Sequence, residues 1–215
     1  MTEPRKLWIA GPAGRLECML RLAPDPRALA VLAHPHPLFG GTLHNPVVFH
    51  SDRELFRRGF ATLRFNFRGA GESEGTHDEG RGEVTDVGSA ASWLRGLFPE
   101  LPLLLVGYSF GGLCSLRYAA KSSDIHGVVA IGLPVRVYDM AFLKGVAKPL
   151  GIVQGERDEY GAPDEVERTV AGLTPAPQIS TVAGATHLFP GQAKEAATAV
   201  VQHALRILDD PSTPE

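Results

Sequence analysis

Cysteine is scarce in this chain of 215 residues, which contains only Cys18 and Cys114. Two cysteines cannot build a disulfide framework, and neither stands in a CxxC or CxxH spacing that would indicate structural zinc. The chain also lacks an HExxH motif and a G-x-x-x-x-G-K-[ST] phosphate-binding loop. Four histidines lie in the N-terminal third of the chain: His34, His36, His44 and His50. No cluster of carboxylates lies near them in the sequence, so roles in loops and on a helix surface are favoured over metal binding. We therefore expect no metal site.

An excess of positive charge is absent as well. Lys and Arg total 21 against 24 Asp and Glu, which gives a formal net charge of −3, and no basic run occurs. This balance argues against a nucleic-acid partner. No apolar stretch approaches the roughly 18 residues that span a bilayer, and no apolar segment typical of a signal peptide follows the first six residues. The sequence predicts a cytoplasmic protein without a membrane partner.

The length and the 44% share of hydrophobic residues are sufficient for one sizeable core. We expect a single domain over residues 1–208. The last seven residues, 209–215, read DDPSTPE. They are polar and contain two prolines, so they are predicted to be a disordered tail.

Hydrophobic periodicity alternates between the strand and helix types along the chain. Apolar or alternating runs predict strands at 7–9, 16–22, 28–33, 60–67, 101–106, 127–131, 149–153 and 179–182. Apolar residues at steps of three and four predict helices at 83–98 and 193–208, and shorter helices are expected at 46–58, 111–121 and 164–173. The first two strands flank a Gly-Pro-Ala-Gly break and should form an antiparallel hairpin. The rest favours a mostly parallel sheet with helices on both faces.

The strongest motif is G-x-S-x-G at residues 107–111, between a predicted strand and a predicted helix. Glycines at the flanking positions allow a very sharp turn, which holds Ser109 in strained backbone geometry and exposes its hydroxyl. The amide of Phe110, at the start of the helix, would face a developing oxyanion. The alternative is a glycine-rich turn with a solvated serine. The context on both sides favours a nucleophile elbow.

A serine hydroxyl needs a base to accept its proton, and the base needs an acid to orient it. After such an elbow, the acid comes first along the chain and the histidine base comes second. His187 lies in a loop after the last strand, whereas His126 precedes a strand and His203 lies within the last helix. His187 is therefore the predicted base. Three carboxylates follow the preceding strand, and the predicted acid is Asp158, with Glu156 and Glu159 as alternatives.

With these residues, the sequence resembles the α/β-hydrolase superfamily. It is most similar to small bacterial serine hydrolases with an AHPHPLFGGT-type loop, a RFNFRGAGESEG-type strand end and a GYSFGG elbow. The resemblance runs from about residue 29 to residue 205. It implies an α/β-hydrolase fold with an eight-stranded sheet, serine-based hydrolysis and no cofactor. Ser109, Asp158 and His187 fall on the family's triad positions.

A second oxyanion donor is expected from the loop that begins at His34, because this loop follows the strand whose carboxyl end should supply that donor. The two prolines of this loop have no N–H, which leaves the amides of His36 and Leu38. The register of the superfamily favours His36.

The expected function is cleavage of a small ester or related acyl bond by Ser109. Alternatives are a serine hydrolase acting on thioesters or amides and a binding protein that has kept the pocket but lost turnover. In the interval between the sixth and seventh predicted strands, residues 134–147 are too few for a cap domain. The cleft should therefore be open and should favour short acyl groups, acetyl to hexanoyl, without activation at lipid interfaces.

Polar residues in an otherwise apolar strand need partners. Arg64, Asn66 and Arg68 are expected on one face of that strand, and the predicted partners of the two arginines are Glu83 and Asp86 at the start of the next helix. This set is interpreted as a structural ion-pair network.

Overall fold

Eight strands form one sheet in the computed structural model, which describes residues 3–209. The spatial order is β1-β2-β4-β3-β5-β6-β7-β8. The β1–β2 hairpin is antiparallel, β2 also pairs antiparallel with β4, and all other neighbours are parallel. The predicted eight-stranded, mostly parallel sheet and its N-terminal hairpin are confirmed. The strands are β1 (Arg5–Gly11), β2 (Gly14–Arg21), β3 (Ala28–Ala33), β4 (Phe60–Phe65), β5 (Leu103–Tyr108), β6 (Gly127–Ile131), β7 (Leu150–Gly155) and β8 (Gln178–Val182).

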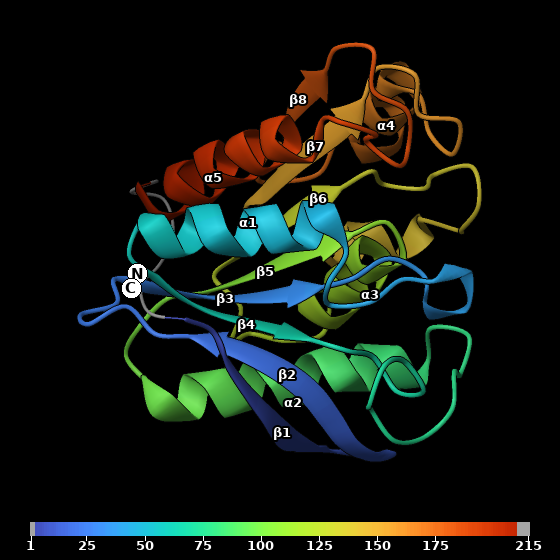
Figure 1. Cartoon of the computed structure of the whole chain (residues 1–215). Helices are drawn as coiled ribbons and strands as arrows, with labels where there is room; N and C mark the ends of the chain where they lie inside the picture. The colour runs from blue at the N-terminus through green and yellow to red at the C-terminus, as the bar shows by residue number, and fades with distance from the viewer. Residues whose placement is uncertain (1–2, 210–215) are drawn as a thin grey trace.

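Helices cover both faces of the sheet. In Figure 1, α1 and α5 lie on one face, while α2 and α3 lie on the other. Between β6 and β7 the described chain forms only the short 3-10 helix η2, so no cap domain covers the sheet there. The helices are η1 (Pro37–Phe39), α1 (Pro46–Arg57), α2 (Gly82–Leu97), α3 (Phe110–Ala119), η2 (Ala141–Gly145), α4 (Pro163–Val170) and α5 (Ala193–Asp209).

The predicted tail begins one residue too early. Asp209 is the last residue of α5, and its carboxylate lies 3.2 Å from the guanidinium of Arg27. The remaining residues of the predicted tail, 210–215, lie outside the described residues.

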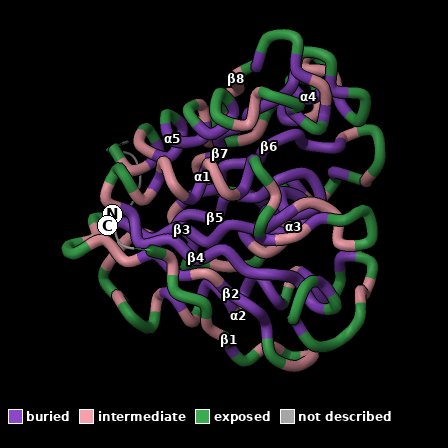
Figure 2. Tube along the Cα trace, viewed as in Figure 1, coloured by how far each residue is buried: buried purple, intermediate pink, exposed green. Residues whose placement is uncertain are grey.

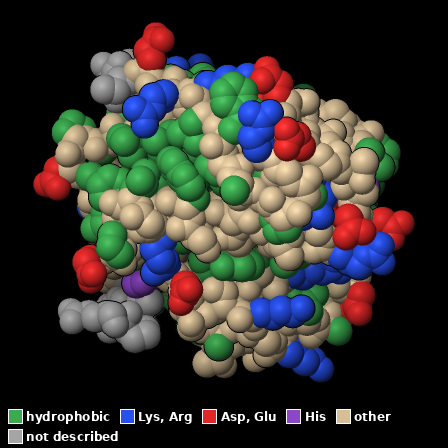
Figure 3. Space-filling model, turned by 90° about the horizontal axis from the view of Figure 1, so that it is seen from below, with side chains coloured by type: hydrophobic (Ala, Val, Ile, Leu, Met, Phe, Trp, Pro, Cys, Tyr) green, Lys and Arg blue, Asp and Glu red, His purple; other side chains and the backbone are tan. Residues whose placement is uncertain are grey.

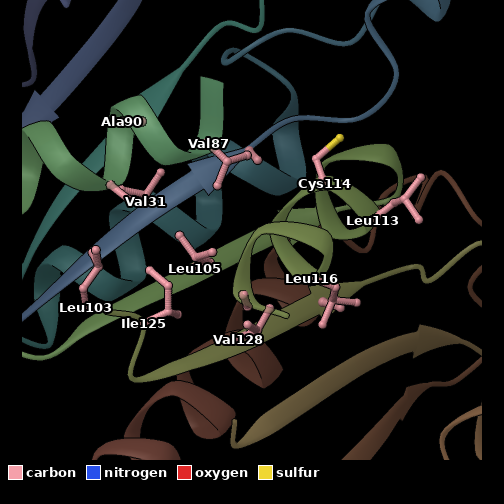
Figure 4. Close-up of a cluster of buried hydrophobic side chains, with 14 of the residues drawn as sticks. Val31, Val87, Ala90, Leu103, Leu105, Leu113, Cys114, Leu116, Ile125 and Val128 are labelled. Carbon is pink, nitrogen blue, oxygen red and sulfur yellow. The ribbon is translucent and has the colours of Figure 1, made fainter. Parts of the chain in front are cut away.

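The core consists of two apolar layers, one on each side of the sheet. Every residue of β3, β4, β5, β6 and β7 is buried, as Figure 2 shows for the centre of the molecule. In Figure 4, Val31 and Leu105 of the sheet belong to the same hydrophobic cluster as Val87 of α2 and Leu116 of α3. Burying a side chain of this size contributes about 1.5–3 kcal/mol. Packing on both faces of the sheet thus fixes the positions of the carboxyl ends of the parallel strands.

The buried arginines on β4 and in the segment after it have partners that only partly match the sequence prediction. Arg68 does pair with Asp86, at 2.7 Å, but Arg64 pairs with Asp52 of α1, with its Nε 3.0 Å from the carboxylate. The predicted pairing of Arg64 with the start of α2 is wrong. Since β4 ends at Phe65, the strand alternation that placed Arg64 and Arg68 on one face does not reach Arg68.

Replacing Arg64 with alanine is expected to lower the free energy of unfolding by about 3 kcal/mol or more. The variant leaves a cavity at a fully buried side chain, and it removes both the ion pair to Asp52 and the hydrogen bond from Nη1 to the Leu43 carbonyl at 2.7 Å. Thermal denaturation measures the loss, and turnover per folded molecule should change much less. An unchanged melting temperature would contradict a structural role.

Candidate active site

Ser109 occupies a strained turn between β5 and α3. Its φ of 54° and ψ of −116° lie in a region that side chains other than glycine rarely adopt. The turn requires glycine on both sides, because a Cβ on Gly107 would overlap the carbonyl of Gly111, and a Cβ on Gly111 would overlap the carbonyl of Ala33. The amide of Ser109 donates to the Ile131 carbonyl at 2.8 Å, which fixes the turn to β6. Strain of this kind is typical of functional positions.

The structure brings Ser109, His187 and Asp158 together although they are far apart in the sequence. His187 Nε2 lies 2.8 Å from Ser109 Oγ, and His187 Nδ1 lies 3.0 and 2.9 Å from the two carboxylate oxygens of Asp158. All three side chains are buried, with Asp158 2% and His187 4% exposed. An imidazole that donates from Nδ1 to a carboxylate keeps Nε2 free to accept the proton of a hydroxyl. This arrangement suits nucleophilic activation of Ser109.

Asp158 is held by two donors besides His187. Gln154, fully buried on β7, donates from Nε2 to Asp158 Oδ2 at 2.9 Å, and the amide of Tyr160 donates to Oδ1 at 2.9 Å. Gln154 itself is fixed, because its Oε1 accepts from the Leu133 amide at 2.8 Å and its Nε2 also donates to the Gly161 carbonyl. The sequence analysis did not identify Gln154. The available signal was a polar residue within an apolar strand, four positions before the acid.

The loop that carries His187 is fastened by neighbouring side chains. The Tyr108 hydroxyl donates to the His187 carbonyl at 2.6 Å, and burial raises the pKa of Tyr108, which keeps this hydroxyl a donor. Glu159 accepts from the His187 amide at 3.1 Å, and Glu156 accepts from the Gly184 amide at 2.6 Å. The two glutamates considered as alternatives to Asp158 therefore support the loop rather than contact the imidazole ring of His187.

Other reactive side chains lie away from this cluster. His126 directly precedes β6, at the amino end of the parallel strands and so opposite the carboxyl end that carries Ser109. His203 is buried on α5 against Gly151. Cys114 is fully buried on α3, where burial raises the pKa of its thiol well above the ordinary value. A thiol in that state is a small apolar side chain, not a nucleophile.

Two amides near Ser109 are free of protein acceptors. Within residues 3–209, neither the Phe110 amide nor the His36 amide donates a hydrogen bond to the protein. The Leu38 amide, by contrast, donates to His36 Nδ1 at 3.3 Å, and the His36 ring lies 4.6 Å from the ring of Phe110. Of the two candidate donors in this loop, only the His36 amide is thus available for a ligand.

His34 joins the His36 loop to the end of β4. Its Nε2 accepts from the Phe67 amide at 3.0 Å, and its Nδ1 lies 2.6 Å from the Pro35 carbonyl, so the neutral ring satisfies both partners. Protonation would place a second N–H against the Phe67 amide. Complete burial lowers the pKa of His34 from 6.5 to about 4.

The stability of the protein is expected to fall below pH 6.5 because of His34. Its folded pKa lies below the unfolded value, so its contribution is complete above pH 6.5 and is lost as the pH falls toward 4. Between pH 7 and 5 the loss is about 2 kcal/mol. Urea unfolding at these two pH values measures it, and His34→Asn should reduce the difference by that amount. An equal difference in both proteins would contradict the assignment, since the other histidines are shared.

Within residues 3–209, no group of three or more His, Cys, Asp or Glu side chains could hold a metal ion. In the same residues no helix has the length and apolar character needed to cross a bilayer. Figure 3 shows positive and negative side chains mixed on the face seen from below, beside a group of hydrophobic side chains. Neither sign of charge dominates that face.

Comparison with known proteins gives consistent matches. Residues 37–169 match the family model described as alpha/beta hydrolase fold. An uncharacterised protein of Rickettsia prowazekii, RP471, is 33% identical over 212 residues, which cover 94% of this chain and 89% of that protein.

Two solved structures cover nearly all of the chain. ATU1826 of Agrobacterium tumefaciens, a protein of unknown function, has a TM-score of 0.89 at 33% identity and covers 98% of this chain and 100% of its own. XC6422 of Xanthomonas campestris, described as an α/β serine hydrolase without a lid, has a TM-score of 0.86 at 32% identity and covers 100% and 98%.

Proposed function

Since this chain belongs to the α/β-hydrolase family, we propose that it cleaves a small ester or a related acyl bond through an acyl-enzyme on Ser109. The observation that carries the proposal is the unbroken chain of contacts from Asp158 through His187 to Ser109 Oγ, with distances of 2.9 and 2.8 Å. Asp158 is the acid, His187 the base and Ser109 the nucleophile.

The first half-reaction transfers the acyl group to the protein. Ser109 Oγ attacks the ester carbonyl carbon and gives its proton to His187 Nε2. The charged imidazole is stabilised by the Asp158 carboxylate. When the tetrahedral intermediate collapses, the carbon–oxygen bond to the alcohol breaks, and the alcohol takes the proton from His187. The acyl group remains bonded to Ser109.

Water completes the reaction on the same residues. His187 accepts a proton from water, the hydroxide oxygen bonds to the acyl carbon, and the bond to Ser109 Oγ breaks with return of the proton to the serine. In both halves the carbonyl oxygen carries negative charge. The free amides of Phe110 and His36 are the proposed donors to it, and removing one such donor typically costs about 10²–10³-fold in kcat.

The size of the acyl group follows from the open construction of the site. Between β6 and β7 the described chain forms only η2, five residues long, so no cap encloses a long acyl chain. Each methylene adds about 0.8 kcal/mol only when it leaves water. We therefore expect kcat/KM to be highest for acetyl to hexanoyl esters, without a jump in rate when the substrate forms an emulsion.

A fluorophosphonate probe tests the proposed function directly. It should label Ser109 in the wild-type protein between pH 6 and 9, and labelling should be lost in His187→Ala. Mass spectrometry of the labelled peptide identifies the residue. A folded wild-type protein that is not labelled at any of these pH values would reject catalysis and favour a binding protein. A panel of chromogenic esters, thioesters and amides then identifies the acyl bond that is cleaved.

A further inference from the structure

Exposed hydrophobic side chains are concentrated at the carboxyl ends of the parallel strands, the end of the sheet where Ser109 lies. Among residues 3–209, seven large hydrophobic residues are exposed, and five of them lie on loops or the short helix η1 at the carboxyl ends of the parallel strands: Leu38, Phe39, Val137, Tyr160 and Leu188. The other two, Trp8 and Leu97, lie on β1 and α2. Single exposed apolar residues are ordinary, but a group of them marks a binding surface.

Three of the five are linked to His187, either directly or through Tyr160. Tyr160 packs edge-on against the His187 ring, with centroids 4.6 Å apart, and is still 44% exposed. Leu188 follows His187 directly and is 70% exposed. Val137 is 51% exposed and lies near Tyr160, because the amide of its neighbour Arg136 donates to the Tyr160 carbonyl at 3.0 Å. We call Val137, Tyr160 and Leu188 the His187 rim.

Leu38 and Phe39 lie on the short helix η1 instead. They follow His36, whose ring lies 4.9 Å from the ring of Phe39 and 4.6 Å from that of Phe110. This region carries the proposed oxyanion donors. The His187 rim is therefore separated from the region where the carbonyl oxygen would lie.

The proposed mechanism decides which part of a substrate meets the His187 rim. The alcohol takes its proton from His187 Nε2, so the alcohol oxygen must come within hydrogen-bond distance of that atom. The carbonyl oxygen points instead toward the Phe110 and His36 amides. The remainder of the alcohol must then extend past the imidazole, over the side chains that surround it.

We propose that the His187 rim binds the alcohol part of the ester and that this alcohol is a large apolar group, while the acyl group is short. The inference rests on the proposed function. None of the three rim side chains carries a formal charge. Arg136, the neighbour of Val137 in the chain, already pairs with Glu165 at 2.8 Å and donates to the Glu159 carbonyl at 3.0 Å, so it is not free to attract an anionic alcohol.

The test is a series of acetate esters of linear alcohols from methanol to hexanol, each used below its solubility limit. These alcohols have nearly equal acidity, so differences in kcat/KM report binding of the alcohol chain. We expect about a twofold increase for each methylene, half of what full removal from water gives, and a hexyl-to-methyl ratio above about ten. The ratio uses the same enzyme in both assays and does not depend on its absolute activity.

Matched variants show whether the rim is responsible. Leu188→Ser and Val137→Ser should each lower the hexyl-to-methyl ratio severalfold, and together they should bring it close to one. Leu97→Ser removes an apolar side chain that is 45% exposed at the end of α2, where the chain leads to the amino end of β5, and should leave the ratio unchanged. Leu188 is exposed, so its replacement is not expected to impair folding, and thermal denaturation checks this.

Two failures can be told apart. If wild-type protein cleaves acetate esters and Ser109 reacts with the fluorophosphonate, but the ratio stays near one, the rim inference is wrong and the proposed function stands. The same holds if Leu188→Ser and Leu97→Ser give equal ratios. If no ester is cleaved and Ser109 is not labelled, the proposed function fails and the inference fails with it.

Discussion

Replacing Ser109 with alanine is expected to lower kcat by about 10⁴-fold or more while the protein remains folded. The variant deletes the atom that would form the acyl-enzyme, and it removes the hydroxyl that donates to His187 Nε2 at 2.8 Å. The small residual rate would come from substrate binding and the oxyanion donors alone. Steady-state hydrolysis of p-nitrophenyl acetate, with active protein counted by folded concentration, measures the loss.

The matched control lies on the helix that follows the nucleophile. Ser115 of α3 is fully buried, and within residues 3–209 its hydroxyl has no hydrogen-bond partner. Ser115→Ala therefore removes the same atom type, six residues after Ser109, without removing a hydrogen bond, and kcat should stay within about twofold of wild type. Retention of more than a few per cent of activity by Ser109→Ala would show that the nucleophile is another residue.

The elements of the fold could be predicted because their patterns are local. The continuous apolar run at 28–33 matches β3 residue for residue, and the run at 127–131 matches β6. Pairings that depend on the position of a distant element could not be predicted. Arg64 contacts Asp52 because α1 crosses that face of β4, and no spacing along the chain relates the two residues.

In the candidate site, too, residues in local motifs could be predicted and residues that depend on distant contacts could not. Ser109 stands in a motif whose glycines are required by the turn itself, and His187 and Asp158 follow from chain order. The sequence could therefore name all three as candidates, and the structure places them within hydrogen-bond distance of one another. Gln154 and the His187 rim could not be identified. The hydrogen bonds of the buried Gln154 side chain depend on which loop lies next to β7 in the folded protein. Leu188 and Tyr160 are exposed because no other part of the described chain packs over them.

Asp158 has an environment in which only a carboxylate satisfies every neighbour. Three N–H groups point at its two oxygens: Tyr160 N at Oδ1, Gln154 Nε2 at Oδ2, and His187 Nδ1 between them. An asparagine offers one oxygen and one NH₂ group. Whichever way the amide turns, its NH₂ meets a fixed donor, either the Tyr160 backbone or the buried Gln154 side chain.

Asp158→Asn is therefore expected to lower kcat by about 10⁴-fold with little change in KM. The amide cannot stabilise the charged imidazole, and an NH₂ facing Nδ1 favours the tautomer with the proton on Nε2, which cannot accept the proton of Ser109. Glu156→Gln is the control, because Glu156 carries the same charge two residues earlier but, within residues 3–209, accepts from the Gly184 amide and not from His187. Its kcat should stay within about threefold of wild type. Equal losses in the two variants would mean that the charge of the loop matters and that Asp158 is not the orienting acid. A small loss in Asp158→Asn alone would leave Glu159, which accepts from the His187 amide at 3.1 Å, as the acid to be tested next.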